Sequence, residues 1–336
     1  MAVLGDLHIV HCMVLRENPK FSVSFRSNSN LVFEQRLFMR VGLVINPTAG
    51  GNKGAGVGES VRAVLASSTH EVIDLSGDSF ATAKAAIQVA IANKAIDALI
   101  LVGGDGMAHL GVNVCANTNV AMAIVPAGTG NDSAGVFGMP MGDAATCTKL
   151  ILENISSPKR IDAIEIEHSL GKTWALGSAS AGFDALVNAR ANKMTWPAGP
   201  MKYYLAMLLE LASFKAIKYR SKIDNVAKDF EAMLCVVSNS GVFGGGMLVV
   251  PEASVTDQKL DLLILHKITR FKLVRIFPRV YKGTHVTDPA VELLTATKVE
   301  IAADGMPIYS DGEYVGQAPF SARVVPGALL VIAPAL

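Results

Sequence analysis

The sequence has few cysteines and no cysteine pair. Its four cysteines lie at positions 12, 115, 147 and 235, far apart and outside any Cys-x-x-Cys motif. The seven histidines likewise show no spacing typical of metal ligands. These patterns argue against a disulfide framework and against a cysteine-based zinc site. They favour a protein of the reducing cytoplasm.

An excess of one charge and long apolar runs are also missing. The 336 residues carry 30 Lys and Arg against 29 Asp and Glu, a formal net charge of +1. Nothing in the overall charge therefore predicts nucleic-acid binding. A helix that spans a membrane needs about 20 apolar residues, and the longest runs, at 96–102, 204–211 and 328–336, are much shorter. Contact with a membrane surface stays open.

The chain does have enough apolar material for a large core. Hydrophobic residues make up 51% of it and charged residues 18%, which excludes a wholly disordered protein. The length corresponds to about two domains. Residues 1–38 lack periodicity, and Asp6, His8 and His11 interrupt any apolar core of a signal peptide. We expect a poorly ordered extension there, with Met39 leading into the first strand.

From residue 40 onward, two patterns follow each other. Strand runs at 41–45, 96–102 and 120–125 alternate with helical runs at 57–67, 80–92, 109–116 and 144–153. This alternation predicts a parallel α/β sheet. Beyond a boundary near Asp162, short strands dominate, at 160–167, 174–180, 231–238, 247–250, 260–266, 298–302 and 321–325, with helices at 184–193, 202–214 and 271–282. The second pattern predicts an antiparallel β domain.

Three glycine-containing loops directly follow strands of the first pattern. They are Asn46-Pro47-Thr48-Ala49-Gly50, Gly103-Gly104-Asp105-Gly106 and Gly128-Thr129-Gly130-Asn131-Asp132. Glycines let phosphate oxygens approach backbone N–H groups, and a following helix adds its positive N-terminal end. Each loop alone is compatible with an ordinary strand-to-helix turn, and Asn131 and Asp132 also suit a helix cap. Two such loops on successive strands favour phosphate binding.

Carboxylates mark two further segments. Asp311-Gly312-Glu313 lies between short strand-like runs; it suits a general base that acts on a hydroxyl, and equally a hairpin turn. Asp257 lies in a loop beyond Gly244-Gly245-Gly246. Together with nearby carbonyl oxygens it suits a hard cation such as Mg²⁺, and the alternative is a solvated loop carboxylate.

The segment 271–282 combines cations with apolar side chains at helical spacing. Its cations are Lys272, Arg275, Arg279 and Lys282. Such a helix is typical of binding to anionic lipid, although many basic stripes are only solvated helix faces. The apolar stretch 196–214 suits either core packing or the entrance of a lipid site.

Taken together and in this order, the motifs resemble the bacterial diacylglycerol kinase family of soluble lipid kinases, which is related to sphingosine and ceramide kinases. The resemblance covers residues 40–336. It implies a Rossmann-like α/β nucleotide domain at 40–162, joined by the C-terminal segment 321–336. It also implies an antiparallel β-sandwich domain for the lipid substrate at 163–320. The active site is expected in the cleft between these domains.

The resemblance also implies roles for particular residues. ATP is expected at the 46–50 loop, at the loop 103–106 with Met107, and at 128–131, with Ser76 as a further hydroxyl contact. Asp311, aided by Glu313, is expected to act as general base on a lipid hydroxyl. A structural Mg²⁺ is expected at Asp257 and the carbonyls of Ser254 and Lys259. Asp132 and Asp162 are expected to form a carboxylate network that links the metals.

The sequence departs from the family pattern at several positions. Thr, Asn and Glu are usual where this chain has Met107, His109 and Leu110. A basic residue is usual at Gly51, for which Lys53 is the nearest substitute, and a glycine is usual at Gln258. The missing hydroxyl and carboxylate would weaken nucleotide binding or change the phosphate donor. The sequence therefore predicts the fold more closely than the substrate.

The function that we predict is ATP-dependent phosphorylation of a lipid hydroxyl, with diacylglycerol as the default acceptor. The alternatives are a sphingoid or other hydroxyl lipid, an enzyme like NAD kinase or phosphofructokinase that acts on a soluble acceptor, and a non-catalytic nucleotide- or lipid-binding module. The expected partners are ATP, Mg²⁺ and a lipid at a membrane surface, with peripheral membrane contact in the cytoplasm and no nucleic acid. A homodimer is compatible with the resemblance.

Overall fold

A computed structural model describes residues 38–197, 200–213 and 215–334. The expected extension before Phe38 lies outside these residues, as do positions 198, 199 and 214 of the apolar stretch 196–214 and the last two residues of the chain.

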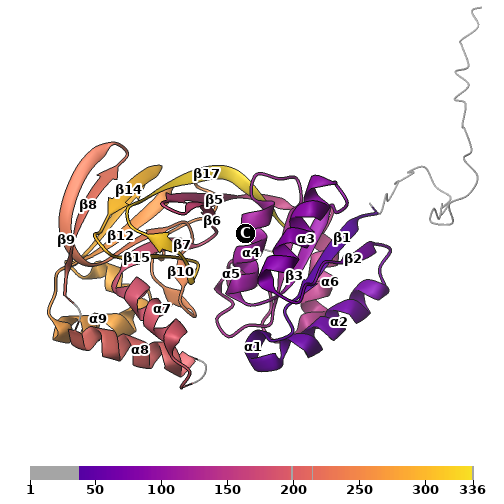
Figure 1. Ribbon diagram of the computed structural model, residues 1–336, viewed down its shortest axis with the longest axis horizontal. Helices are drawn as coiled ribbons and strands as arrows, with labels where there is room; N and C mark the ends of the chain where they lie inside the picture. Colours follow the sequence, from indigo (N-terminus) through magenta and orange to yellow (C-terminus); the bar gives the residue numbers. More distant parts are fainter. Residues whose placement is uncertain (1–37, 198–199, 214, 335–336) are drawn as a thin grey trace, which may run out of the picture. The chain divides into compact units, whose positions relative to one another are not determined.

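The first part of the described chain alternates strands and helices around a parallel sheet (Figure 1). The strands are β1 (Arg40–Ile45), β2 (Glu71–Asp74), β3 (Ala98–Gly103) and β4 (Ala121–Pro126). The helices are α1 (Ala49–Asn52), α2 (Gly54–Ala66), α3 (Phe80–Ala92), α4 (Asp105–Cys115), α5 (Asp132–Val136) and α6 (Ala144–Asn154). The strands pair in the order β4-β3-β1-β2. β3 and β4 are buried along their whole length, which explains their continuous apolar runs.

Three features of this part differ from the sequence prediction. β2 was not expected, because it is short and mostly exposed and therefore lacks an apolar run. α5 itself is not predicted, although the sequence does predict that Asn131 and Asp132 suit a helix cap, and Asn131 is the N-cap residue of α5. α4 begins at Asp105 and not at His109, since Gly104 serves as its N-cap residue and an acidic side chain is favourable in the first turn.

The second part is built mainly from antiparallel strands. They are β5 (Lys159–His168), β6 (Gly171–Ala175), β7 (Ser178–Gly182), β8 (Ile217–Ile223), β9 (Val226–Ser238), β10 (Val242–Phe243), β11 (Met247–Leu248), β12 (Leu260–His266), β13 (Val291–Ala296), β14 (Lys298–Ala302), β15 (Pro307–Ser310), β16 (Glu313–Gln317) and β17 (Phe320–Val331). Its helices are α7 (Phe183–Lys193), α8 (Pro200–Ser213), α9 (Arg270–Val280) and the short 3-10 turn η1 (Thr284–Thr287). The predicted class, a parallel α/β part followed by a β-sandwich-like part, is confirmed.

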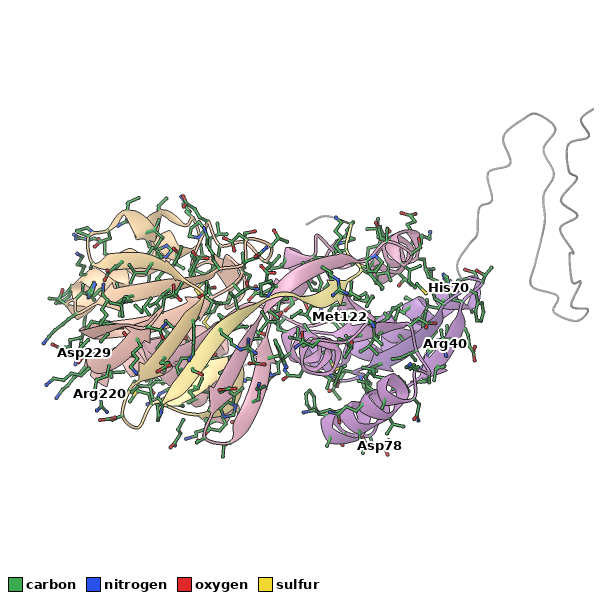
Figure 2. The ribbon with its side chains drawn as sticks, turned by 90° about the horizontal axis from the view of Figure 1, so that it is seen from above. Arg40, His70, Asp78, Met122, Arg220 and Asp229 are labelled. Atoms are coloured by element: carbon green, nitrogen blue, oxygen red, sulfur yellow. The ribbon has the colours of Figure 1, made fainter. Side chains whose placement is uncertain are left out.

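The antiparallel part holds more strands than the sequence indicated. β8 alternates buried and exposed positions and is half charged, so it shows no apolar run. It forms a hairpin with β9 in which Arg220 faces Asp229 (Figure 2). The single strand expected at 174–180 is divided into β6 and β7, because the backbone N–H groups at the division bind a distant carboxylate.

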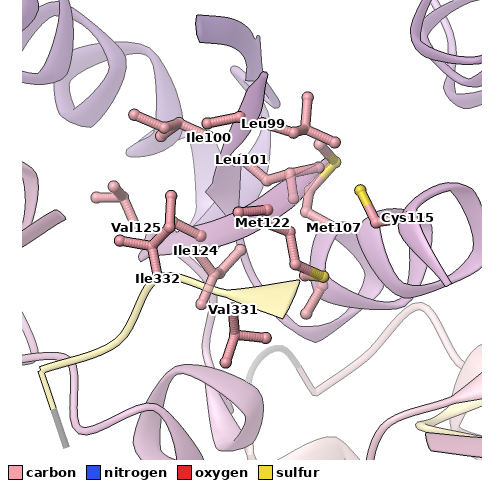
Figure 3. Packing of buried hydrophobic residues seen from close by; sticks show 14 of the residues in the cluster. Leu99, Ile100, Leu101, Met107, Cys115, Met122, Ile124, Val125, Val331 and Ile332 are labelled. Atoms are coloured by element: carbon pink, nitrogen blue, oxygen red, sulfur yellow. The ribbon is translucent and has the colours of Figure 1, made fainter. Parts of the chain in front are cut away.

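β17 connects the two parts. It pairs antiparallel with β5 and β14, and its last residue, Val331, pairs in parallel with Met122 of β4. Figure 2 shows Met122 beside this C-terminal strand, and Figure 3 shows Val331 and Ile332 among the core side chains of β3 and β4. The division into domains at 40–162 with 321–336, and at 163–320, remains a prediction.

The core of the first part also contains two of the departures from the family pattern. Met107 and Leu110, both in α4, are buried in it, and Figure 3 shows Met107 there. Cys115, Cys147 and Cys235 are buried and unpaired. None of the helices in the described ranges is long and apolar enough to cross a bilayer.

Candidate active site

The three glycine-containing loops lie at the carboxyl ends of the neighbouring strands β1, β3 and β4. Two of them pack backbone against backbone, since a Cβ atom on Gly128 would lie 2.4 Å from the Cα of Gly104. Gly50 has a positive φ of 58°, and a Cβ there would lie 2.3 Å from the carbonyl oxygen of Ala127. Only glycine fits at these positions, so the loops form one continuous surface beyond the sheet.

Polar side chains in the loops hold the loops themselves in shape. The Oδ1 of Asn46 accepts hydrogen bonds from the backbone N–H of Thr48 at 3.1 Å and from its hydroxyl at 2.8 Å. Asn131 and Gly128 bond to each other in both directions, each at 2.9 Å. Ser76 accepts a hydrogen bond from the N–H of Ile45 at 3.0 Å. Because these side chains bind the loops themselves, mainly backbone groups and small side chains remain to contact a ligand.

A cavity of about 490 Å³ opens over this surface. It is lined by Asn46, Ala49, Phe80, Gly104, Gly106, Met107, Gly128 and Glu313. Thr129 and Gly130 line a second cavity instead, whereas Pro47, Thr48, Gly50, Gly103 and Asn131 line neither of the two. Part of the predicted nucleotide-binding set is therefore brought together around one space.

Phe80 is a lining residue that the sequence analysis missed. A capping box between Ser79 and Thr82 makes it the first residue of α3, and its side chain is 52% exposed although it is large and apolar. The sequence offers only a weak signal for it, a large aromatic residue directly after the N-cap Ser79 of a predicted helix.

Asp105 begins α4 and lies among other carboxylates. Its Oδ1 accepts a hydrogen bond from the N–H of Ser133 at 3.0 Å. Burial raises the pKa of Asp105, and the nearby charges of Asp132 and Asp311 raise this pKa further. Asp132 itself accepts hydrogen bonds from the N–H groups of Gly245 and Gly246 at 2.8 and 2.7 Å. Its carboxylate therefore ties the first part of the chain to the triple-glycine loop of the second.

The carboxylate of Asp311 is almost fully engaged by backbone. It accepts hydrogen bonds from the N–H groups of Leu176, Gly177 and Ser178 at 2.8, 2.9 and 2.9 Å. Only 8% of its side chain is exposed, and the Nδ1 of His109 lies 3.7 Å from its Oδ2. The residue also has a positive φ of 48°, typical of a tight turn. Asp311 therefore anchors the turn that carries Glu313.

Glu313, two residues later, is exposed. A Cβ atom on Gly106 would lie 3.0 Å from its Oε1, so the carboxylate reaches across to the loop after β3. Of the two carboxylates in this turn, Glu313 is the one that faces open space. The sequence motif did not distinguish their surroundings.

A second cavity, of about 670 Å³, extends from these carboxylates into the antiparallel part. Asp105, Asp311 and Glu313 line one end of it. The remainder of its wall is largely apolar and comes from β9, β12, α7, α8 and α9, and includes Phe183, Val187, Met207, Met233, Leu263, Leu273, Ile276 and Phe277. Both cavities share Gly106 and Glu313, so a polar space and an apolar space meet at one carboxylate.

Asp184, near the start of α7, is a charged group in the wall of the apolar cavity. Both of its carboxylate oxygens are shielded from solvent, and neither has a partner in hydrogen-bonding geometry among the residues that the structure describes. Burial raises the pKa of Asp184 from 3.8 to about 6, and the nearby Ser180 hydroxyl and Ala185 N–H offset this only in part. Sequence reasoning missed this residue, because its buried surroundings come from other segments of the chain, which include Tyr219 of β8 and Cys235 of β9.

Replacing Asp184 with Asn is expected to stabilise the protein more as the pH rises. The folded pKa lies above the ordinary value of 3.8, so the unfolded chain loses this proton first, and the carboxyl group destabilises the fold increasingly as the pH rises through about 4 to 6. We expect the variant to gain about 3 kcal/mol at pH 8 and about half of that at pH 5. Urea unfolding at both values tests this, with the exposed Asp78→Asn as control. A gain that does not change with pH would contradict it.

Of the residues predicted for metal sites, Ser254, Asp257 and Lys259 share one loop that Asp162 contacts, whereas Asp132 binds the triple-glycine loop. The Oδ1 of Asp257 accepts the N–H of Lys259 at 3.1 Å within its own loop. Asp162 accepts the N–H groups of Gln258 at 2.7 Å and Gly327 at 2.9 Å, and so joins this loop to β17. Across the described ranges, no group of three or more His, Cys, Asp or Glu side chains is arranged to hold a metal ion. A metal at this loop, with the carbonyls of Ser254 and Lys259, stays a prediction.

Comparisons with known proteins agree with this architecture. Residues 40–166 match the family "Diacylglycerol kinase catalytic domain", and residues 177–333 match the "YegS C-terminal NAD kinase beta sandwich-like domain". The chain is 32% identical over 296 residues to a diacylglycerol kinase of Mycobacterium tuberculosis, covering 88% of this chain and 95% of that protein. It is 26% identical over 255 residues to a diacylglycerol kinase of Bacillus subtilis, covering 75% and 80%.

A solved structure bears on the fold alone. A crystal structure of a diacylglycerol kinase from Bacillus anthracis superposes with a TM-score of 0.67 at 19% identity, covering 88% of this chain and 97% of that one. The two family matches and the relative at 32% identity show the family as well as the fold, since together they span nearly all of the described residues. The chain therefore belongs to the diacylglycerol kinase family and is a lipid kinase.

Proposed function

We propose that the protein transfers the γ-phosphate of ATP to the free hydroxyl of diacylglycerol and releases phosphatidic acid and ADP. One observation carries this proposal. The cavity beside the glycine loops and the apolar cavity meet at Glu313, which lines both. Acyl chains fill an apolar cavity of about 670 Å³ favourably. A water-soluble acceptor such as NAD or fructose 6-phosphate has no large apolar group to place there.

The contacts support distinct roles for the two carboxylates of the turn. Glu313 is exposed and accepts the proton of the lipid hydroxyl. As that oxygen forms its bond to the γ-phosphorus, the bond from phosphorus to the bridging oxygen of ATP breaks and ADP leaves. Asp311, held by three backbone N–H groups, is a positioning residue for Glu313. The N-terminus of α4, at Gly104 and Asp105, points its free N–H groups toward phosphate.

The residues around Asp105 fit a Mg²⁺ ion that arrives with the nucleotide. The charges of Asp132 and Asp311 raise the pKa of Asp105, and a divalent cation would relieve this repulsion. Mg²⁺ is typically held by one or two carboxylates together with substrate phosphates. Asp105 would hold it here, and it would supply neutralisation of phosphate charge.

Phe80 supports the placement of the nucleotide base in the 490 Å³ cavity. Stacking of a base on an aromatic ring contributes about 1–3 kcal/mol. We therefore expect Phe80→Ala to raise KM for ATP about tenfold and to change kcat little, as steady-state kinetics at saturating lipid would measure. Val89→Ala, an exposed apolar change in the same helix, serves as control. An unchanged KM would place the base elsewhere.

A second acceptor class is favoured by Asp184. Its carboxylate is buried in the wall of an apolar cavity and has no hydrogen-bond partner within the described part of the chain, and it would pair with the ammonium group of a sphingoid base. Diacylglycerol offers no such donor beside its reacting hydroxyl. A sphingoid or other hydroxyl lipid with a second donor is therefore the alternative acceptor.

Phosphate transfer from radiolabelled ATP tests these proposals. The acceptors are dioleoylglycerol and sphingosine in mixed micelles, with NAD and fructose 6-phosphate as soluble controls and the Glu313→Gln variant as blank. Label in phosphatidic acid supports the main proposal, and label only in sphingosine phosphate moves the assignment to the second class. Label only in a soluble acceptor would overturn both.

The same proposal places the enzyme in the cytoplasm, where ATP is supplied, at the surface of the membrane that holds its lipid. A homodimer remains a prediction from the family resemblance.

A further inference from the structure

Helix α9 has two faces with different surroundings. Leu273 and Ile276 are buried on its inner face and line the apolar cavity, together with Phe277 and Val280. In Figure 1, α9 lies close to α8, which contributes Met207 to the same wall. One face of α9 is thus part of the lipid cavity.

The opposite face is exposed and combines aromatic, aliphatic and cationic side chains. Phe271 is 90% exposed, Val274 55% and Tyr281 52%, and their spacing of three and seven residues puts them on one side of a helix. Cations flank them. We call this set the outer face of α9, and it consists of four residues of the helix and the two that directly follow it: Arg270, Phe271, Val274, Arg275, Tyr281 and Lys282.

The cations of the outer face form no ion pair within the described part of the chain. Lys272 and Arg279, at the border between the two faces, both pair with Asp288. By contrast, Arg270, Arg275 and Lys282 take part in no ion pair with any residue that the structure describes. The sequence from Arg270 to Lys282 contains no Asp or Glu. The outer face therefore carries uncompensated positive charge around large apolar side chains.

We propose that the outer face of α9 docks on a membrane surface that contains anionic lipid, so that the cavity behind the helix receives its lipid directly from the bilayer. This rests on the proposed function. Basic side chains beside exposed aromatic and aliphatic ones are the pattern of helices that lie in the headgroup region. Tyr281 lies at the border between the apolar cavity and the outer surface, because it lines the cavity and its side chain is half exposed. The cavity thus reaches the surface at the C-terminal end of this helix.

Vesicle sedimentation tests the proposal. The wild type is compared with Arg270→Gln/Arg275→Gln/Lys282→Gln and with Phe271→Asp/Val274→Asp, on vesicles of phosphatidylcholine alone or mixed with phosphatidylglycerol. Each cation near an anionic surface strengthens binding about fivefold, so the triple variant should bind mixed vesicles about 100-fold more weakly. The Phe271/Val274 variant should lose binding to a similar extent, about 100-fold.

Matched variants in the first part of the chain control for charge and apolarity. They are Lys84→Gln/Lys94→Gln/Lys149→Gln and Val89→Asp, and they should bind vesicles like the wild type. The thermal unfolding of all variants should match the wild type, because every changed side chain is exposed except that of Lys84, which is half-buried. Vesicle binding by the α9 variants equal to that of the wild type would overturn the proposal, as would equal losses in the control variants.

Activity assays separate this inference from the proposed function. On short-chain diacylglycerol in detergent micelles the α9 variants should keep the wild-type rate, whereas on diacylglycerol in mixed vesicles their rate should fall with their binding. Loss of activity in micelles as well would contradict docking as the role of this face. Vesicle binding that depends on the outer face, in a protein that phosphorylates none of the lipids, would uphold the docking surface and reject the proposed function.

Discussion

Replacing Glu313 with Gln is expected to lower kcat for lipid phosphorylation about 1,000-fold, with little change in KM for ATP. Gln keeps the shape and hydrogen-bonding capacity of Glu but cannot accept the proton of the attacking hydroxyl. The side chain is exposed at the junction of the two cavities, so no buried contact is lost. Steady-state kinetics with dioleoylglycerol in mixed micelles measure the effect, and thermal unfolding should match the wild type.

Two further variants make this result specific. Asp304→Asn changes an exposed carboxylate on the same antiparallel part, away from both cavities, and should leave kcat unchanged. Asp311→Asn should behave differently from Glu313→Gln, because its carboxylate serves three backbone N–H groups and its loss also destabilises the fold, by about 1–3 kcal/mol. A Glu313→Gln enzyme that keeps most of its kcat, beside an inactive but stable Asp311→Asn enzyme, would return the role of general base to Asp311.

The sequence predicted the parts of this site that depend on local chain geometry. A buried apolar strand followed by glycines predicts a phosphate loop wherever it occurs, and the segments after β1, β3 and β4 all lie at the same edge of the sheet. Glycine is required at Gly50 and Gly128 because the backbone of a neighbouring loop approaches closely, at Ala127 and Gly104, and this approach follows from the shared position of the loops at the ends of neighbouring strands.

Other properties of the site arise from contacts between distant segments and were not predictable from local pattern. The different surroundings of Asp311 and Glu313 arise because Asp311 binds backbone N–H groups that begin at Leu176, 135 residues earlier in the chain. Asp132 binds Gly245, 113 residues later, and the metal network that the family resemblance implies for it stays a prediction. The apolar cavity is assembled from α7, α8, α9 and strands between them, and no single segment carries its signature.

Asp105→Asn is expected to abolish turnover, with kcat at least about 1,000-fold lower, while the fold stays as stable as the wild type or becomes more stable. The side-chain carbonyl oxygen of Asn can still accept the hydrogen bond from the N–H of Ser133. The change also removes a buried negative charge that lies near Asp132 and Asp311 and whose pKa is raised by burial and by those charges. Relief of this repulsion favours the folded state at neutral pH.

These opposite effects on activity and stability identify a functional carboxylate. If Asp105 only shaped the loop, its replacement would lower stability and activity together. If it holds the cation that accompanies ATP, activity should stay low even when Mg²⁺ is raised far above the level that saturates the wild type, because an amide is a weaker ligand for a hard cation than a carboxylate. Thermal unfolding and a Mg²⁺ titration of kcat, with Asp78→Asn as the exposed control, separate these cases. Recovery of full activity at high Mg²⁺ would show that Asp105 contributes only to the affinity for Mg²⁺. Full activity at ordinary Mg²⁺ would show that Asp105 has no role in the reaction.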